Sequence, residues 1–221
     1  MISQILPSNR YLIQERKLTE EVILRFHLGY VDHSGEVYVD ADFQGKLPSL
    51  DKRFYHSTMF PIFSVYGECV AVSCRPLNPS PTKYINSTYD KAKHLYGLAQ
   101  TWQDCLREKA IYVVEGNISL LQMYQAGIKN CVAMLGSNLS SYQVALLNRF
   151  VTKIIIVPDS DKAGMNVIGK LKKKVETKLY DSDISFTYIQ LPQGQDPDDY
   201  FKNGSHTLQD FKALPEEELV L

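Results

Sequence analysis

Along the second half of the chain, the pattern of hydrophobic and polar residues changes repeatedly between one typical of strands and one typical of helices. Short apolar runs of the kind found in buried strands occur at residues 110–116, 130–136, 153–161 and 184–192. Between them, apolar residues recur every three or four positions, as in amphipathic helices, at residues 118–127, 140–150 and 163–180. Strands and helices in this order predict a parallel sheet with helices on both faces, and the binding crevice of such a sheet lies beyond the carboxyl ends of its strands.

The first half carries shorter and less regular elements. Residues 18–30 predict a short helix that ends in left-handed geometry at Gly29. Residues 36–43 alternate as in a strand, and residues 59–74 predict two strands joined at Tyr66 and Gly67. The polar stretch 83–90 is predicted to be a loop, and the last residues, 214–221, to be a loosely held end.

Together these patterns predict an α/β fold with two parts. A smaller α+β subdomain is expected over residues 1–108, a parallel α/β domain over 109–203 and a C-terminal tail over 204–221. At 221 residues, 44% of them apolar, the chain is large enough to bury a substantial core. No stretch approaches the ~18 apolar residues that span a bilayer and the N-terminus lacks the order of a signal peptide, so we expect a cytoplasmic protein with no membrane partner.

Charge is unevenly distributed, although the formal net charge is only −1. A near-neutral total argues against a protein that binds nucleic acid mainly through bulk electrostatics. Cations of the first half gather at residues 46–53 and 75–93, whereas acids of the second half stand at turns and strand ends. The first half could therefore hold phosphate and the second half a metal ion, and a solvated surface explains each cluster equally well.

Acidic residues stand where two of the predicted strands end. Glu115 follows the first strand of the parallel sheet, and Asp159 and Asp161 follow the third. If those strands are neighbours, three carboxylates converge at one edge of the sheet, where like charges resist joint ionisation. A hard divalent cation such as Mg²⁺ removes that conflict. Asp159 and Asp161 could equally be the N-cap and first turn of the next helix, where acids are favoured in any case.

The stretches VVEG and IIIVPDSD resemble the signature of a Toprim domain, a glutamate-glycine pair after one strand and an Asp-x-Asp after a later one. The flanks are similar, in order, to segments of the RNA polymerase domain of DnaG-like bacterial primases: YLIQERKLTEEVILRFHLGY, MFPIFSVYGECVAVSCRPL, KYINSTYDKAKHLYGL and LPQGQDPDDYF. The resemblance runs from about residue 10 to residue 202. It implies a Toprim domain, preceded by a smaller α+β subdomain.

The resemblance also implies roles for particular residues. The metal-site carboxylates of the Toprim centre correspond to Glu115, Asp159 and Asp161, and a further acidic pair corresponds to Asp196 and Asp198. Positions that face template, nucleotide or product phosphate in such primases correspond to Arg16, Arg75, Lys83, Asn86 and Lys91. The family further implies Mg²⁺ or Mn²⁺ as cofactor, and single-stranded DNA and ribonucleoside triphosphates as partners.

Several of these residues also have a purely structural explanation. Asp196 precedes Pro197, so it is also a well-placed N-cap for a helix with proline at its first position. Arg16 could be an ordinary surface cation. Lys83 and Lys91 lie in a segment with little apolar periodicity, which favours a functional loop.

Three positions depart from the family pattern. Tyr55 and Ser57 stand where basic residues are common just before MFPI, although Arg53 and His56 lie close. The third departure concerns the metal site. Members usually carry an aspartate four residues after the glutamate, and Ser119 stands there in this chain. The missing carboxylate puts in question either the number of bound metal ions or activity itself. The sequence also lacks the family's zinc-binding module and helicase-binding region. We therefore expect an excised domain or a minimal protein, for example from a phage or mobile element, with a separate zinc-binding module and a replicative helicase as partners.

The expected function is that of a DNA primase, which makes short RNA primers on single-stranded DNA by metal-dependent nucleotidyl transfer. Two alternatives stay open. A Toprim nuclease would use the same carboxylates with water as the nucleophile, but it would not need the KYINS and HLYGL segments. A catalytically inactive nucleic-acid-binding module of a replication complex would explain Ser119.

Overall fold

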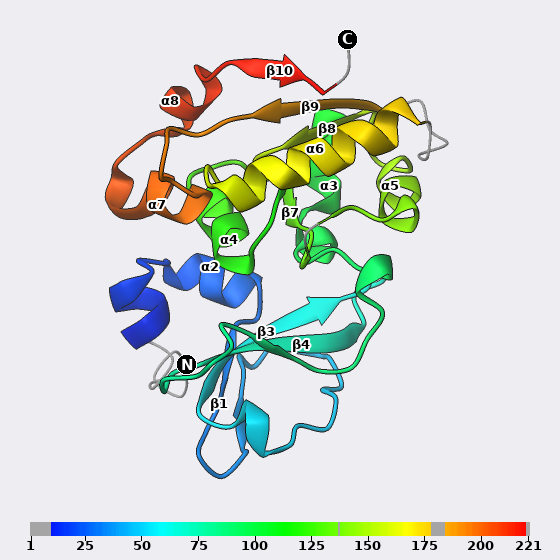
Figure 1. Cartoon of the computed structure of the whole chain (residues 1–221). Coiled ribbons are helices and arrows are strands. Elements are labelled where there is room, and N and C mark those ends of the chain that lie inside the picture. Colours follow the sequence, from blue (N-terminus) through cyan, green and yellow to red (C-terminus); the bar gives the residue numbers. More distant parts are fainter. Residues whose placement is uncertain (1–9, 137, 178–183, 220–221) are drawn as a thin grey trace. The chain divides into compact units, whose positions relative to one another are not determined.

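The chain folds into two compact units, each built on one β-sheet (Figure 1). The first unit ends at Tyr89 and the second begins at Asp90. The computed structural model describes residues 10–136, 138–177 and 184–219. No helix within these ranges is both long enough and apolar enough to cross a membrane.

Helix α3 (Leu98–Glu108) explains why the units divide earlier than the boundary expected after residue 108. It contacts two strands of the second unit, β6 (Ala110–Val114) and β7 (Cys131–Ala133), and groups with them. The sequence analysis missed this helix, although its apolar residues Leu98, Trp102, Cys105 and Leu106 recur at helical spacing. The division into functional domains at residues 108 and 203 stays a prediction.

The first unit is built on an antiparallel sheet with the strand order β2-β1-β3-β4-β5. The strands are β1 (Gly29–Val31), β2 (Val37–Tyr38), β3 (Ser57–Phe63), β4 (Cys69–Pro76) and β5 (Ile85–Asn86). The two strands predicted between residues 59 and 74 are confirmed as β3 and β4. Their turn contains Gly67, whose φ of 84° is the left-handed conformation that glycine adopts easily.

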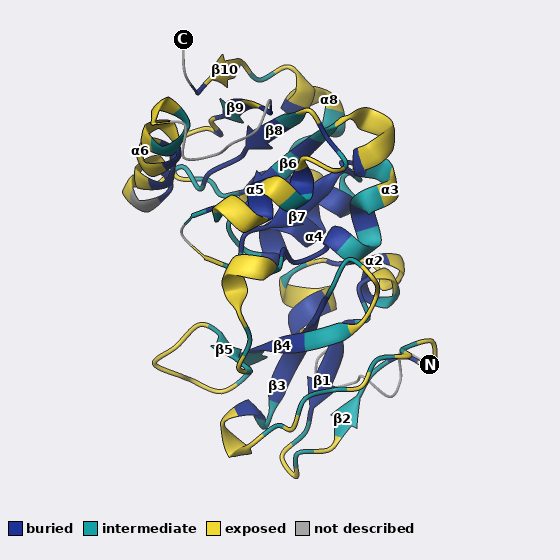
Figure 2. Cartoon of the chain, turned by 90° about the vertical axis from the view of Figure 1, so that its right-hand side faces the viewer, coloured by how far each residue is buried: buried dark blue, intermediate teal, exposed yellow. Residues whose placement is uncertain are grey.

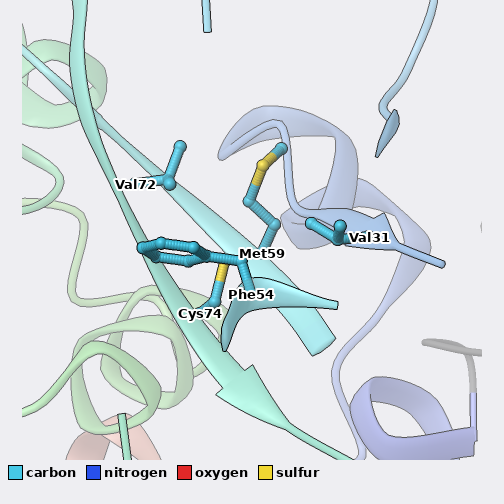
Figure 3. Close-up of a cluster of buried hydrophobic side chains, with 5 residues drawn as sticks. All are labelled: Val31, Phe54, Met59, Val72 and Cys74. Atoms are coloured by element: carbon cyan, nitrogen blue, oxygen red, sulfur yellow. The ribbon is translucent and has the colours of Figure 1, made fainter. Parts of the chain in front are cut away.

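A compact hydrophobic core holds this sheet together (Figure 3). Its buried side chains come from β1, β3, β4 and the 3₁₀ turn η3 (Lys52–Phe54), and they are Val31, Phe54, Met59, Val72 and Cys74. A π-helical turn, η2 (Arg10–Glu15), adds buried Tyr11 and Leu12 to the unit.

Two expectations for the first unit are wrong. Helix α2 (Glu20–Arg25) ends before Gly29, and His27 takes the left-handed conformation with a φ of 51°. Gly29 instead begins β1, where a Cβ atom would lie 2.7 Å from the carbonyl oxygen of Tyr38, so the close approach of β2 requires glycine. The expected polar loop at 83–90 contains β5, which pairs with β4.

The second unit is built on the predicted parallel sheet, with the strand order β10-β9-β8-β6-β7. The remaining strands are β8 (Lys153–Ile156), β9 (Ser185–Ile189) and β10 (Glu216–Glu218). All pairs are parallel except that of β10 with β9. Because β6 and β8 are neighbours, with Val113 opposite Ile156, the carboxyl ends of these strands meet at the same edge.

Helices cover both faces of this sheet, as predicted. Helix α6 (Lys162–Glu176) lies on one face and α3 on the other, as Figures 1 and 2 together show. Helix α4 (Asn117–Gln125) connects β6 to β7, and α5 (Ser141–Leu147) connects β7 to β8. The residues 178–180, at the expected end of α6, lie outside the described part of the chain.

The C-terminal segment is fixed to the second unit, so the expectation of a loosely held end is wrong for residues 214–219. Here α7 (Pro197–Phe201), the 3₁₀ turn η5 (Lys202–Gly204) and α8 (Leu208–Lys212) lead to β10, which pairs with β9. Phe211 in α8 is fully buried and contacts the rings of Tyr112, Tyr200 and Phe201. Residues 220 and 221 lie outside the described residues.

Replacing Phe211 by alanine should lower the free energy of unfolding by about 3–5 kcal/mol, because the change leaves a cavity among buried rings. Tyr66→Ala is the matched control, since Tyr66 is 81% exposed and its loss should change that free energy by less than about 0.5 kcal/mol. Denaturant unfolding measured by circular dichroism compares the two. Equal midpoints would contradict the placement of α8 in the core.

Candidate active site

Three acidic residues follow the ends of β6 and β8: Glu115 after β6, and Asp159 and Asp161 after β8. The N–H of Val157 donates a hydrogen bond to the carbonyl oxygen of Val113 at 2.9 Å, which holds the two strand ends side by side. The half-buried carboxylate of Glu115 accepts a hydrogen bond from the backbone N–H of Asp159. The pKa of Glu115 is raised, first by burial and also by the negative charge of Asp161, although the Asp159 N–H acts to lower it. Glu115 and Asp161 are therefore electrostatic neighbours, and the backbone of Asp159 contacts Glu115.

Asp161 has the helix-capping role that was weighed against metal binding. Its Oδ1 accepts a hydrogen bond from the backbone N–H of Gly164 at 2.8 Å and caps α6. The side chain is otherwise exposed. Capping therefore leaves its second carboxylate oxygen accessible to a cation.

Gly164 shapes this loop, and the sequence analysis missed it. A Cβ atom at this position would lie 1.9 Å from the backbone oxygen of Asp159, far closer than any real contact. The first turn of α6 therefore packs directly on the Asp159 backbone, and only glycine leaves room for it. The available signal was the glycine at the end of PDSDKAG.

A second group of aspartates surrounds the start of α7. One carboxylate oxygen from each of Asp196, Asp198 and Asp199 lies within 4.8 Å of the other two. Asp196 caps α7 by accepting a hydrogen bond from the Asp199 N–H at 2.8 Å, as the capping interpretation predicted. Asp198 is only 3% exposed, and its Oδ1 accepts a hydrogen bond from Nε2 of Gln122 at 3.1 Å. Sequence reasoning missed Asp199 and Gln122.

The two acidic groups lie on adjoining loops. Ser160 donates its backbone N–H to the carbonyl oxygen of Gln195 at 3.1 Å. Ser160 separates Asp159 from Asp161, and Gln195 directly precedes Asp196. The structure therefore brings the five predicted carboxylates to adjoining loops of the second unit.

The Asp196, Asp198 and Asp199 group fits a hard divalent cation, whereas within the described ranges the ligand atoms of Glu115, Asp159 and Asp161 do not all come within 4.8 Å of one another. Glu115 Oε1 is buried and has no hydrogen-bond partner among the residues that the structure describes. Such an oxygen is costly to bury unless a proton or a cation satisfies it. Asp196, Asp198 and Asp199 together offer three oxygens close enough to meet at one ion, and carboxylate oxygens are the ligands that Mg²⁺ and Ca²⁺ prefer.

Two of the predicted basic residues share an aromatic partner in the first unit. Arg16 Nε donates a hydrogen bond to the hydroxyl of Tyr11 at 3.1 Å, and its guanidinium carbon lies 5.2 Å from the ring centroid. The guanidinium carbon of Arg75 lies 5.1 Å from the same centroid and 5.6 Å from that of Tyr84. Tyr11 therefore gathers two cations that are far apart in the sequence, through cation–π contacts.

A cavity of about 370 Å³ in the first unit has Arg75 and Lys83 in its wall. The rest of the wall comes from Tyr11, Glu15 and the segment after Arg75. Arg75 Nη1 is buried and has no hydrogen-bond partner within the described ranges. The wall of this cavity thus contains two cationic residues, Arg75 and Lys83, and one acidic residue, Glu15, and a guanidinium binds phosphate oxygens readily.

The three other predicted residues, Arg16, Asn86 and Lys91, do not line this cavity. Asn86, in β5, is opposite Ser73 of β4 and does not line the cavity. Lys91 belongs to the second unit, in the exposed 3₁₀ turn η4 (Lys91–Lys93). The structure thus brings Arg16, Arg75 and Lys83 together in one unit and places Lys91 in the unit that carries the carboxylates.

Comparison with known proteins identifies both parts of the chain. Residues 112–201 match the Toprim-like family, and residues 43–102 match the N-terminal domain of the DNA primase catalytic core. The DNA primase of Pasteurella multocida is 31% identical over 221 residues, covering 91% of this chain and 38% of the relative. The DNA primase of Synechocystis is 29% identical over 211 residues, covering 93% of this chain and 31% of the relative.

Solved structures that resemble this chain come from the same kind of protein. The E. coli primase catalytic core has a TM-score of 0.76 at 27% identity, over 95% of this chain and 72% of its own. The chain belongs to the DnaG-type DNA primase catalytic cores with a Toprim domain. A DnaG primase catalytic domain bound to single-stranded DNA has a TM-score of 0.75 at 26% identity, over 96% of this chain and 72% of its own. The chain spans only about a third of the length of the curated primases above, at 31% and 38%.

Ser119 is buried in the helix that directly follows Glu115 and Gly116. It lies in the first turn of α4 and is 6% exposed, and its hydroxyl would be 3.8 Å from a Cβ atom built on Gly116. Gln122, which contacts Asp198, is three residues further along, so both residues share one face of α4. A carboxylate at position 119 would stand on the face of α4 that leads from Glu115 towards Asp198.

Gly164→Ala should remove most of the thermal stabilisation that Mn²⁺ gives, because the new methyl group must displace the backbone of Asp159. Gly169→Ala is the matched control in the same helix. No atom lies within 4 Å of its added Cβ, so it should keep the Mn²⁺ response and gain up to about 1 kcal/mol of stability from helix propensity. Thermal midpoints with and without Mn²⁺ test both, and equal shifts would contradict a cation site at Asp159.

Proposed function

We propose that this chain is the primer-synthesising core of a DNA primase, which joins ribonucleotides on a single-stranded DNA template. The observation that carries the proposal is the pairing of two acidic groups on adjoining loops after strands of a Toprim sheet. When bound, Mg²⁺ or Mn²⁺ would lower the pKa of the attacking 3′-hydroxyl and neutralise charge on the leaving pyrophosphate. Glu115, Asp159, Asp161, Asp196 and Asp198 are the residues we assign to this centre, with Asp199 added.

The residues of the centre do different work in this proposal. Glu115 Oε1, buried and with a raised pKa, can accept a proton or contact a cation. Asp161 and Asp196 each use one oxygen to cap a helix, which fixes the direction of the carboxylate. Asp198 is buried and held by Gln122, so its position is set before any substrate binds.

The basic residues would hold the nucleic acid and the nucleotide. Arg75 and Lys83 line a cavity in which they would contact a phosphate group, and Arg16 lies beside Arg75 through Tyr11. With so few cations and a net charge of −1, binding should be weak and sensitive to salt. Weak binding is compatible with an enzyme that makes short products. We assign template binding to residues 1–108, metal chemistry to 109–203 and a supporting role to 204–221.

The proposed partners are single-stranded DNA, ribonucleoside triphosphates, a zinc-binding module and a replicative helicase. One related structure, that of the Aquifex aeolicus primase, contains zinc-binding and RNA polymerase domains, and this chain covers 55% of it at 25% identity. That arrangement supports a zinc-binding partner for the present core. Ser119 is the observation that favours the alternative of an inactive nucleic-acid-binding module.

One assay separates primase, nuclease and inactive module. The protein is incubated with single-stranded DNA, labelled ribonucleotides and Mg²⁺ or Mn²⁺. We expect short oligoribonucleotides from the wild type and at least a hundredfold less, about 3 kcal/mol in activation free energy, from Asp159→Asn. Glu68→Gln, at an exposed turn of the first unit, should keep full activity. Shortened DNA would indicate a nuclease, and unchanged substrates would indicate the binding module.

Ser119→Asp should tighten divalent-cation binding without unfolding the protein, because an anion in the first turn of a helix is favourable. Ser141→Asp is the matched control, since it adds an acid to the first turn of α5 instead. Calorimetric titration with Mn²⁺ compares the affinities. An affinity unchanged by Ser119→Asp would show that position 119 lies outside the metal centre.

A further inference from the structure

Lys91 lies in a short turn, η4, that has few stabilising contacts within itself. Turn η4 has no buried residue of its own. Its local support is Asp90, which accepts a hydrogen bond from the Ala92 N–H at 3.1 Å and lies 3.4 Å from Nζ of Lys93. Exposed pairs of this kind contribute little to stability. The position of Lys91 must therefore be fixed by another part of the second unit.

Gln143, in α5, supplies that support. Its side chain is 2% exposed, and Nε2 donates hydrogen bonds to the carbonyl oxygens of Lys91 at 3.0 Å and His94 at 2.7 Å. Oε1 of the same amide accepts a hydrogen bond from the Ser140 N–H at 2.8 Å. The oxygen of this buried amide thus accepts a hydrogen bond within its own helix cap, and its nitrogen donates hydrogen bonds to the turn that carries Lys91.

Ser140 adds a second link between α5 and the turn. Its hydroxyl accepts a hydrogen bond from the Gln143 N–H at 3.0 Å and donates one to the carbonyl oxygen of Ala92 at 2.5 Å. The chain after the turn is also fixed, because Tyr96 and Ala133 of β7 exchange two backbone hydrogen bonds of 3.0 Å. The backbone from Lys91 to Tyr96 is therefore held at both ends.

A helix cap alone does not require these contacts. Helix α8 has the same capping box, in which Thr207 pairs with Asp210. A carboxylate at the third helical position is sufficient there, because the box needs only an acceptor at that position. In α5 the corresponding residue is an amide, and its two N–H donors point to the carbonyl oxygens of the Lys91 turn. The N–H donors of this amide therefore stabilise the turn, and the helix cap does not require them.

We infer that Gln143 is a positioning residue that holds Lys91 in place for a phosphate of the bound nucleic acid or nucleotide. This inference rests on the proposed function and on the role in phosphate binding that the resemblance to primases implies for Lys91. Fixing the backbone beneath a lysine reduces the conformational entropy that the protein loses on binding. Release of the turn should therefore weaken binding without removing any charge.

Gln143→Glu and Gln143→Met test this role together, because the glutamate adds a negative charge beside the Lys91 turn and the methionine adds none. The carboxylate keeps the acceptor of the capping box and loses both donors to the carbonyl oxygens of Lys91 and His94. We expect faster amide hydrogen exchange over residues 91–94 in the free protein. Binding to a fluorescein-labelled oligo(dT) should weaken by about the same factor as in Lys91→Ala, with the salt slope smaller by about 0.7 in each case. The double variant should bind no more weakly than Lys91→Ala alone, because the two changes remove one interaction.

Two further variants keep the test decisive. Gln143→Met retains the volume of the side chain and removes both donors, so it replaces Gln143→Glu if the buried carboxylate prevents folding. Thr207→Ala removes the cap of α8 and should leave oligo(dT) binding and exchange over residues 91–94 unchanged. A loss of binding in Thr207→Ala equal to that in the Gln143 variants would show a general effect of stability and overturn the inference.

The outcomes separate this inference from the proposed function. If Lys91→Ala binds oligo(dT) as the wild type does, the assignment of Lys91 to phosphate binding is wrong. If Lys91→Ala weakens binding and the Gln143 variants do not, the positioning role of Gln143 is wrong and the phosphate assignment stands. Unchanged hydrogen exchange over residues 91–94 in the Gln143 variants would also overturn the positioning role.

Discussion

The parallel pairing of β6 with β8 is the constraint on which the candidate site depends. Because Val113 lies opposite Ile156, Glu115 and Asp159 leave neighbouring strands at nearly the same level of the sheet. Burial raises the pKa of Glu115, and the negative charge of Asp161 adds to that effect, although the N–H of Asp159 acts to lower the pKa. The described side chains provide no hydrogen-bond partner for Glu115 Oε1. A proton or a divalent cation would satisfy this oxygen.

The second acidic group is stabilised differently. Asp198 is almost fully buried, and its Oδ1 accepts a hydrogen bond from the neutral amide of Gln122. This donor adds no charge of its own to the acidic group. The pairing of Gln122 with Asp198 thus fixes the direction of this carboxylate.

Hydrophobic periodicity predicted the second unit well, because its strands are buried on both faces and read as continuous apolar runs. The same periodicity did not predict elements that are fixed by backbone hydrogen bonds or by backbone conformation. Strand β10 consists of three exposed glutamates that join the edge of β9 through backbone hydrogen bonds, so no apolar pattern marks it. The end of α2 was predicted at the wrong residue. His27 adopts the left-handed conformation that was expected of Gly29, and Gly29 instead allows the close packing of two strands.

The candidate site was predictable in its residue types and not in its supporting contacts. Motifs place the acids at strand ends, but Gln122 meets Asp198 across 76 positions and Gln143 meets Lys91 across 52. Such contacts arise only when elements pack. Helix capping and metal binding, which the sequence presents as alternatives, are compatible at Asp161 and Asp196. Each cap bond occupies one oxygen and restrains the rotation of the carboxylate, so the other oxygen is held in one direction before a cation arrives.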